Sequence, residues 1–568
     1  MTPTSFSSSS HRRFTIRALA IGAAICGVLS ATPREAAALE RLCDPAFEDC
    51  REPLIRLIDQ ETVRIDVAFW FMEDARYSSA LVRARNRGVP IRVLMDTRAN
   101  VNYPGNIFCL DQIKSAGIPM REKTTGGILH WKMMLFAGQN TVQFSGANYS
   151  DEAFVPEVPW TAYVDEVIYF TDRPGWVNSF MTKFDDVWTS QVGYRDYANV
   201  TSVQRAYATF PIDPELNFPP GGFRERSVAA YAAETQRIDS LMYRITDRAH
   251  TDALIAAAQR GVQVRIVHEQ LQYRDPTRVW HSWNVDRLWA AGREILVNGQ
   301  PSIRVRQRRH QGLSHEKLTV LTSQHLSVIG SSNWTSPSSD TQLEHNLFTT
   351  DLAIYNWSRE HFDRKWNNTG GAPETAPFVP LPPDVPQLVT PTSGALNQSL
   401  TPTLTWDGGL WAHRYDVYVG TDPNNLTKVV NDRELGPVQQ SVTLTPLSPG
   451  TVYYWRVVSR TMAGLSRSSP ICSFKTAGTG GSVPTNFCLS PPPEPADPVL
   501  VLEPQDIRRS GSGSGGDGVV PSGATNVGPA GVPAGRTPTS NSTFTGQRAV
   551  PRPWLPDTRP DVGEGQEP

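Results

Sequence analysis

Two blocks in the first two thirds of the chain share one order of apolar and polar positions. The first, residues 64–96, begins with Arg-Ile-Asp, continues at helical spacing, turns at Arg-Gly-Val and ends in an apolar run. The second, residues 237–269, repeats this order, and both landmarks are displaced by 173 residues (237 minus 64, and 260 minus 87). A matched offset at two landmarks indicates an internal duplication.

Each block predicts a strand, an amphipathic helix and a second strand. The helical stretches carry apolar residues three or four positions apart, namely Ala80, Leu81 and Ala84 in one block and Leu254, Ala257 and Ala258 in the other. A strand–helix–strand unit implies parallel pairing of its strands. The predicted fold class is therefore α/β, with two similar lobes in one chain.

Beyond the two blocks the pattern changes to strand-like alternation. Prolines gather in residues 373–386, which is typical of a semi-rigid linker. Residues 403–406, 415–419 and 453–457 alternate apolar and polar positions, with turns between them. After residue 478 Gly, Ser, Pro and Thr dominate, and such a segment buries too little apolar surface to fold.

The N-terminus has the layout of a secretory signal peptide. Arg12 and Arg13 precede an apolar run over residues 18–31, and small residues follow at 36–38. The run is short for a transmembrane span. We predict export to the extracellular space or the periplasm, with an uncleaved membrane anchor as the alternative.

These changes of texture predict six segments in a chain of 568 residues. They are a signal peptide (1–38), lobe 1 (39–200), lobe 2 (201–370), a Pro-rich linker (371–384), an all-β domain (385–477) and a disordered tail (478–568).

Charge and cysteine content narrow the function classes. The 54 basic and 56 acidic side chains give a formal charge of −2, which excludes a polybasic protein that binds through net charge. In an oxidising compartment Cys43 with Cys50, and Cys472 with Cys488, would close short loops. Five cysteines remain after signal cleavage, so one thiol would be free.

Each lobe ends in the same set of polar residues. They are His130, Lys132, Asn148 and Glu166 in the first half, and His315, Lys317, Ser331, Asn333 and Glu344 in the second. The His, Lys and Asn pairs are all displaced by 185 residues (315 minus 130). In His-x-Lys on a strand both side chains point to one face. Asn follows His at hairpin spacing, so we expect it to return beside the His–Lys pair.

This repeated set resembles the signature of the phospholipase D superfamily, His-x-Lys followed by Gly-Ser-x-x-Asn. The resemblance covers roughly residues 45–370. The first half departs from it, because Ser145 and Gly146 are in swapped order. The superfamily often has an Asp after each Lys; here Ala137 stands at that place in the first half and Thr322 in the second. The resemblance implies a duplicated phospholipase D-like α/β sandwich, a two-lobed pseudo-dimer.

Residues 447–453 resemble the tyrosine corner of fibronectin type III domains, and Trp406 fits that sandwich. The all-β domain is therefore expected to be fibronectin type III-like.

The resemblance also implies roles for the repeated set. It implies a phosphohistidine on the first-half histidine, so His130 is the expected nucleophile and His315 the general acid. Lysine and asparagine would bind the non-bridging oxygens, and glutamate would orient each ring. We expect no cofactor and no metal, because neither motif has a second His or Cys at ligand spacing and the adjacent lysine repels cations.

Two segments are candidates for substrate contact. Arg304, Arg306 and Arg308 alternate along a predicted strand and would present a cationic row to a phosphodiester, with an ordinary solvated face as the alternative. Aromatic residues within 273–289 would form a lip for a lipid surface, a stacking wall for bases, or local core.

The sequence as a whole favours a secreted, monomeric phospholipase D-like hydrolase that cleaves phospholipid headgroup diesters and makes transient contact with a membrane surface. An extracellular metal-independent nuclease, with nucleic acid as its substrate, is the first alternative. A non-catalytic surface-binding protein is the second.

Overall fold

The structure is a computed structural model that describes residues 40–155, 162–371, 373–434 and 439–493. The predicted signal peptide lies outside the described residues, as do the residues after 493. Within the described ranges no helix combines the length and the apolar character needed to cross a bilayer.

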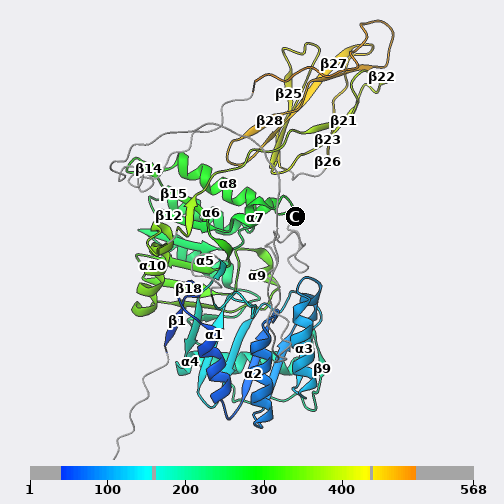
Figure 1. The fold of residues 1–568 in the computed structure, drawn as a ribbon. Coiled ribbons are helices and arrows are strands. Elements are labelled where there is room, and N and C mark those ends of the chain that lie inside the picture. The colour runs from blue at the N-terminus through cyan, green and yellow to red at the C-terminus, as the bar shows by residue number, and fades with distance from the viewer. Residues whose placement is uncertain (1–39, 156–161, 372, 435–438, 494–568) are drawn as a thin grey trace, which may run out of the picture. The chain divides into compact units, whose positions relative to one another are not determined.

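Lobe 1 is an eight-stranded mixed sheet with helices on both faces (Figure 1). The strands, in spatial order, are β1 (Arg41–Cys43), β8 (Ile168–Thr171), β6 (Thr141–Ser145), β5 (Lys132–Phe136), β2 (Ile65–Phe69), β3 (Ile91–Met95), β4 (Met120–Lys123) and β9 (Tyr194–Ala198). The helices are α1 (Arg51–Gln60), α2 (Ala75–Asn86), the 3₁₀ helix η1 (Thr97–Val101), α3 (Gly105–Ser115) and α4 (Pro174–Thr189).

Lobe 2 repeats this order strand for strand. Its sheet runs β10 (Leu216–Asn217), β19 (Asn346–Thr349), β18 (Leu326–Gly330), β17 (Lys317–Leu321), β11 (Arg237–Met242), β12 (Gln263–His268), β15 (Ile303–Arg308) and β20 (Thr375–Pro377). Its helices are α5 (Phe223–Ala233), α6 (Arg248–Gln259), α7 (Gln270–Arg274), α8 (Val279–Glu294), α9 (Ser336–Asp340) and α10 (Leu352–Asn367). The short strands β13 (Leu296–Val297) and β14 (Gln300–Pro301) pair with each other.

The predicted strand–helix–strand units are confirmed, and the same local signals build both. β2 pairs in parallel with β3, and β11 pairs in parallel with β12. Asp74 caps α2 and Asp247 caps α6, each accepting a hydrogen bond from a backbone N–H of the first turn. Gly88 and Gly261 follow these helices at φ +90° and +95°, a left-handed conformation that other residues adopt only with strain.

The two lobes share one apolar core. It contains Phe144 and Phe180 from lobe 1 and Leu318 and Phe362 from lobe 2, all fully buried. Helices α4 and α10 both pack into this core.

Two backbone contacts cross from one lobe to the other. β7 (Ala162–Asp165) of lobe 1 pairs in parallel with β16 (Gln311–Ser314) of lobe 2. An isolated parallel bridge joins Leu129 of lobe 1 to Leu343 of lobe 2. Each crossing ends directly beside a residue of the predicted site.

The C-terminal region is all-β, as predicted. One sheet contains β21 (Gln387–Thr390), β23 (Thr403–Asp407) and β26 (Gln439–Thr443). The other contains β22 (Ala395–Gln398), β29 (Cys472–Thr476), β27 (Val452–Arg460), β24 (Arg414–Gly420) and β25 (Thr427–Glu434), with β28 (Ser466–Ser468) beside β27. Trp406 and Trp455 are buried in the core, and the hydroxyl of Tyr453 accepts a hydrogen bond from the backbone N–H of Ser448. The fibronectin type III assignment stays a prediction.

Two segment boundaries were wrong. The predicted linker 371–384 begins inside lobe 2, because β20 adds to that sheet and Phe378 is buried in its core. The predicted disordered tail begins too early, because Cys488 is disulfide-bonded to Cys472 and Leu489 forms a bridge with Ile471.

The expected cysteine chemistry is confirmed for the described residues. Cys43 pairs with Cys50 and Cys472 with Cys488, while Cys109 is a buried free thiol.

The glycine after α2 gives a test of the fold. A Cβ at Gly88 would meet no atom within 4 Å, so Gly88→Ala adds backbone strain without a clash. We expect Gly88→Ala to lower the free energy of unfolding by roughly 1–2 kcal/mol, and Gly88→Asn to cost clearly less, since Asn tolerates the left-handed region. Urea unfolding followed by tryptophan fluorescence measures both. Equal losses in the two variants would contradict the strain explanation.

Candidate active site

The backbone crossings between the lobes place each predicted histidine. The N–H of His130 donates to the carbonyl of Leu343 at 2.9 Å, and the N–H of His315 donates to the carbonyl of Asp165 at 3.1 Å. The residue that follows each carbonyl is a predicted glutamate. Each crossing therefore brings a histidine of one lobe to a glutamate of the other.

The two histidine–glutamate pairs are exchanged between the lobes. Nδ1 of His130 lies 2.9 and 2.8 Å from the two carboxylate oxygens of Glu344. Nδ1 of His315 makes a short hydrogen bond with Glu166. A carboxylate on Nδ1 fixes the orientation of the ring and leaves Nε2 for chemistry. Neither lobe holds a complete pair of its own.

Both predicted lysines are buried at the same centre. Nζ of Lys132 donates to the carbonyl of His130 at 2.8 Å. Nζ of Lys317 lies 2.9 Å from Nδ1 of His315 and 3.9 Å from Glu166. Two buried ammonium groups beside two imidazoles are suited to an anion with several oxygen atoms.

The two predicted asparagines have unused hydrogen-bonding capacity. Each follows a strand of the hairpin expected from the sequence, β5–β6 for Asn148 and β17–β18 for Asn333. The Oδ1 atoms of Asn148 and Asn333 are buried and have no hydrogen-bond partner in the described structure. A buried amide without a partner is costly, so a ligand that pairs with it gains affinity.

Burial and positive charge keep both rings neutral. Burial lowers the pKa of His130 and of His315 well below the usual value, and Lys132 and Lys317 lower both further. A neutral imidazole has a lone pair that can attack phosphorus.

The carboxylates and one lysine are shifted toward neutral pH. Burial raises the pKa of Glu166 and of Glu344 to about 8, although nearby lysines oppose it. Burial lowers the pKa of Lys317 to about 8, although the glutamates oppose it. These groups can exchange protons at neutral pH.

One serine makes the two pairs unequal. The hydroxyl of Ser331 donates to Glu344, which favours the ionised carboxylate. Lobe 1 has Gly146 at the equivalent place, where a Cβ would come within 2.7 Å of Oε2 of Glu166. A side chain at position 146 would therefore make Glu166 shift from its present place.

A buried ionic cluster supports the second motif from behind. Glu316, the middle residue of that His-x-Lys, lies 3.0 Å from Nε2 of His361 and 3.3 Å from Nζ of Lys365. Nδ1 of His361 lies 3.0 Å from Asp44 of lobe 1. Burial lowers the pKa of His361, but the two carboxylates outweigh it, so the pKa is raised overall. His361 thus links Asp44 of lobe 1 to Glu316 of lobe 2.

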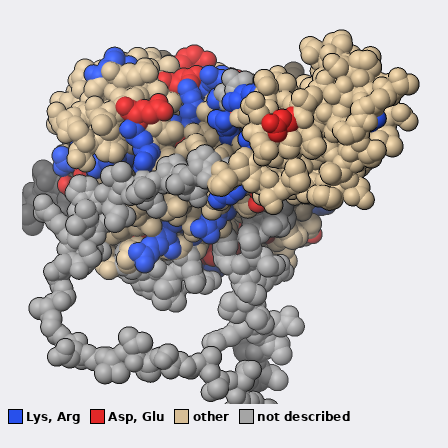
Figure 2. All heavy atoms as spheres, turned by 90° about the horizontal axis from the view of Figure 1, so that it is seen from above, with Lys and Arg blue, Asp and Glu red and all other residues tan. Residues whose placement is uncertain are grey.

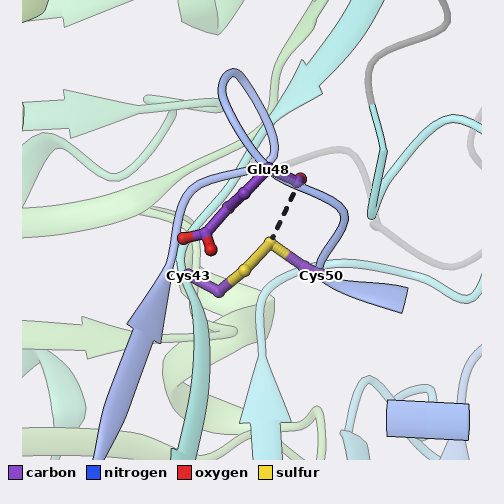
Figure 3. Close-up of side chains that lie close together, drawn as sticks. All are labelled: Cys43, Glu48 and Cys50. Carbon is purple, nitrogen blue, oxygen red and sulfur yellow. Dashed lines mark hydrogen bonds between the residues drawn. A yellow bond between two sulfur atoms is a disulfide. The ribbon is translucent and has the colours of Figure 1, made fainter. Parts of the chain in front are cut away.

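A disulfide holds the loop that carries Asp44. Figure 3 shows Cys43 and Cys50 joined, with Glu48 beside them. Within the described ranges these three residues are the one group close enough to hold a metal ion. Because the two sulfur atoms are bonded to each other, they are not thiolates, and the group is a poor fit for a metal.

Comparison with known proteins agrees with this geometry. The family model described as "Cardiolipin synthase, PLD-like domain" matches residues 54–188 and again residues 230–366. The same family model thus matches both halves of the duplication. The two matches coincide with the two lobes that supply the site. No curated protein sequence matches the chain.

Several solved structures are similar to the PLD-like lobes. The phosphatidylserine synthase of Haemophilus influenzae Rd KW20 is 15% identical, with a TM-score of 0.48, over 60% of this chain and 87% of that one. Nuc from Salmonella typhimurium, a phospholipase D family member, is 22% identical, with a TM-score of 0.25, over 28% of this chain and 99% of that one. The polyphosphate kinase of Porphyromonas gingivalis is 13% identical, with a TM-score of 0.40, over 57% of this chain and 50% of that one.

The prediction of a cationic row on β15 was wrong. Arg306 and Arg308 are buried, and their guanidinium groups serve the protein itself. Arg306 donates to the hydroxyl and carbonyl of Thr375, and Arg308 lies 2.8 Å from Glu269. Arg304 lies over the ring of Trp366 at 5.5 Å. These arginines therefore make contacts within PLD-like lobe 2.

The aromatic segment 273–289 is core, which was one of the three expected possibilities. Tyr273, His281, Trp283 and Trp289 are all buried in PLD-like lobe 2. Trp280 is half-buried and packs edge to face against Trp283, so most of the segment is local core.

Two residues beside the second histidine were missed. The ring of Tyr243 lies 4.5 Å from that of His315, and Nζ of Lys317 lies 5.1 Å from the Tyr243 ring centre. Arg244 follows. Its charge lowers the pKa of His315, after burial and the two lysines, and adds to the effect of burial in lowering the pKa of Lys317. The sequence could have indicated Tyr243 and Arg244, because they directly follow a strand of the repeated block.

Surface charge does not form a single field on the face that Figure 2 presents. Lys and Arg lie among Asp and Glu there, in keeping with the near-zero net charge.

The pKa of Lys317 predicts the alkaline limb of activity. As pH rises through about 8 the ammonium loses its proton and its attraction for phosphoryl oxygens, so kcat/KM on bis(p-nitrophenyl) phosphate should fall with a midpoint near 8. In Lys317→Arg the limb should move above pH 10 at a lower maximum, because arginine keeps its proton. An unmoved limb in Lys317→Arg would assign the titration to another group.

Proposed function

We propose that this protein is a secreted, metal-independent phosphodiesterase that hydrolyses phospholipid headgroup diesters through a phosphohistidine. The observation that carries the proposal is the pair of exchanged His–Glu contacts around one buried centre with two lysines. Such a centre supplies a nucleophile, an acid and positive charge without a metal.

In the first step Nε2 of His130 attacks phosphorus, and the bond to the headgroup oxygen breaks. Nε2–H of His315 gives its proton to that oxygen. Glu166, with its pKa near 8, passes a proton to Nδ1 of His315. In the second step water attacks phosphorus, the P–N bond breaks, and the protons return to His315 and Glu166. Phosphatidate and the free headgroup alcohol are released.

The inequality of the two pairs supports this division of roles. The hydroxyl of Ser331 donates to Glu344, and a Glu344 oxygen that accepts Nδ1–H of His130 leaves a lone pair on Nε2 of that ring. Lys317 stands 2.9 Å from Nδ1 of His315, and this cation makes His315 the better proton donor.

Export is part of the proposal. The signal-like N-terminus and two disulfides within the described residues support an oxidising compartment.

The substrate test offers the purified mature chain phosphatidylcholine, single-stranded DNA and double-stranded DNA in the presence of EDTA. We expect release of choline and phosphatidate, and no DNA cleavage. DNA cleavage alone would replace the lipid substrate by nucleic acid. Phosphatidyl transfer to an added alcohol without phosphatidate would replace hydrolysis by transfer, and inertness toward every diester would contradict catalysis.

Because each glutamate contacts the histidine of the other lobe, replacing a glutamate should impair the step that its partner histidine performs. Glu166→Gln removes the proton relay to the acid His315, so activity should fall at least 100-fold on phosphatidylcholine and much less on a p-nitrophenyl diester, whose leaving group needs no proton. Glu344→Gln weakens the nucleophile His130, so it should impair both substrates alike. The same ratio of activities in the two variants would contradict the assignment of roles.

A covalent intermediate predicts a label on His130. Rapid quenching of wild-type turnover on a ³²P-labelled diester should leave label on the peptide that contains His130, and His130→Ala should leave none. Label on His315 would reverse the roles. Absence of label from both histidines at normal turnover would contradict the covalent mechanism.

A further inference from the structure

One short segment of PLD-like lobe 1 exposes large apolar side chains. Residues 99–110 contain no charged residue. Val101, Ile107 and Phe108 are 70%, 45% and 59% exposed, and Pro104 between them is exposed as well. No other stretch of eight described residues exposes three large apolar side chains. Such a local cluster is a feature of interaction surfaces.

An aromatic cluster leads from this segment toward the first histidine. Tyr103 stacks on Phe71 with ring centres 3.7 Å apart. Phe71 packs with Trp70, Ala99 and Ile128 in a small buried cluster. Ile128 lies two residues before His130 in the sequence. Apolar side chains thus form a continuous series from the exposed segment to the loop that holds the nucleophile.

Hydrogen bonds fix the segment to that loop. The carboxylate of Asp96 accepts from the N–H of Leu129 at 3.1 Å, and Arg98 donates to the carbonyl of Gly126 at 2.8 Å. On the other side Oδ1 of Asn106 accepts from the N–H of Met72 at 2.8 Å. The exposed side chains are therefore carried on an ordered support next to the site.

The other lobe differs at the matching positions. The repeat offset of 173 residues places Tyr243 and Arg244 opposite Trp70 and Phe71. Tyr243 and Arg244 lie beside His315 and Lys317, so the lobe 2 side of the centre is polar and cationic. An amphiphilic phosphodiester fits this difference, with its apolar part on lobe 1 and its headgroup toward lobe 2.

We propose that residues 101–108 dock on a lipid surface, beside the loop that holds His130. The proposal rests on the proposed phospholipid substrate. The absence of charge in the segment favours a zwitterionic lipid surface, since neither anionic lipid nor a charged protein partner has a counter-charge there. Burial of large apolar side chains is the source of affinity.

The test separates docking from chemistry. The double variant Ile107→Ser/Phe108→Ser is compared with wild type for co-sedimentation with phosphatidylcholine vesicles and for turnover of bis(p-nitrophenyl) phosphate in free solution. We expect vesicle binding to fall roughly tenfold per side chain, with unchanged turnover of the soluble diester. The matched control Val63→Ser/Val192→Ser removes two exposed apolar side chains elsewhere, 56% and 86% exposed, and should keep full vesicle binding.

Each outcome distinguishes the claims. Wild-type binding that persists in 0.5 M NaCl supports apolar docking, whereas binding abolished by salt would overturn it. Equal binding by wild type and the double variant would also overturn it. A concentration-dependent dimer in sedimentation velocity that the double variant abolishes would make the occupant a second copy of this chain. Normal docking with no phospholipid hydrolysis would leave docking intact and contradict the proposed function instead.

Discussion

The site depends on two backbone crossings between the PLD-like lobes. The backbone carbonyl of Leu343 accepts a hydrogen bond from the N–H of His130, and that of Asp165 accepts one from the N–H of His315. Because a glutamate follows each carbonyl, backbone geometry alone delivers a carboxylate to the ring of the opposite lobe. The shared apolar core and the cluster around His361 and Glu316 hold the crossings in register. A single lobe would have a histidine and no carboxylate, which is why the duplication is required for the chemistry.

Burial gives these groups their reactivity. At the joint core, burial brings the pKa of Glu166, Glu344 and Lys317 to about 8 and lowers the pKa of both histidines well below the usual value. The two lobes have different residues at a few matching positions of the repeat. Ser331 has no counterpart at Gly146, and Arg244 replaces Phe71. The duplication supplies two similar sets of residues, and these few differences make the two sets chemically unequal.

The sequence was sufficient for the duplication and the strand–helix–strand units, and it named the seven residues that lie together at the centre, whereas the place of Asn148 and Asn333 there stays a prediction. Matched offsets carry that information, since a repeated spacing must fold to a repeated geometry. The exchange of glutamates could not be predicted, because spacing within a lobe does not reveal contacts between lobes. The prediction that Arg306 and Arg308 contact substrate was wrong for a related reason. An alternating strand has two faces, and pattern alone did not show that β20 and α10 cover the arginine face.

The most direct test of the exchanged pairing is the ¹⁵N chemical shift of each histidine Nδ1 in the two glutamine variants. The account predicts that Glu344→Gln shifts Nδ1 of His130 and leaves His315 nearly unchanged, while Glu166→Gln does the reverse. A shift in the histidine of the same lobe, His315 for Glu344 or His130 for Glu166, would contradict it.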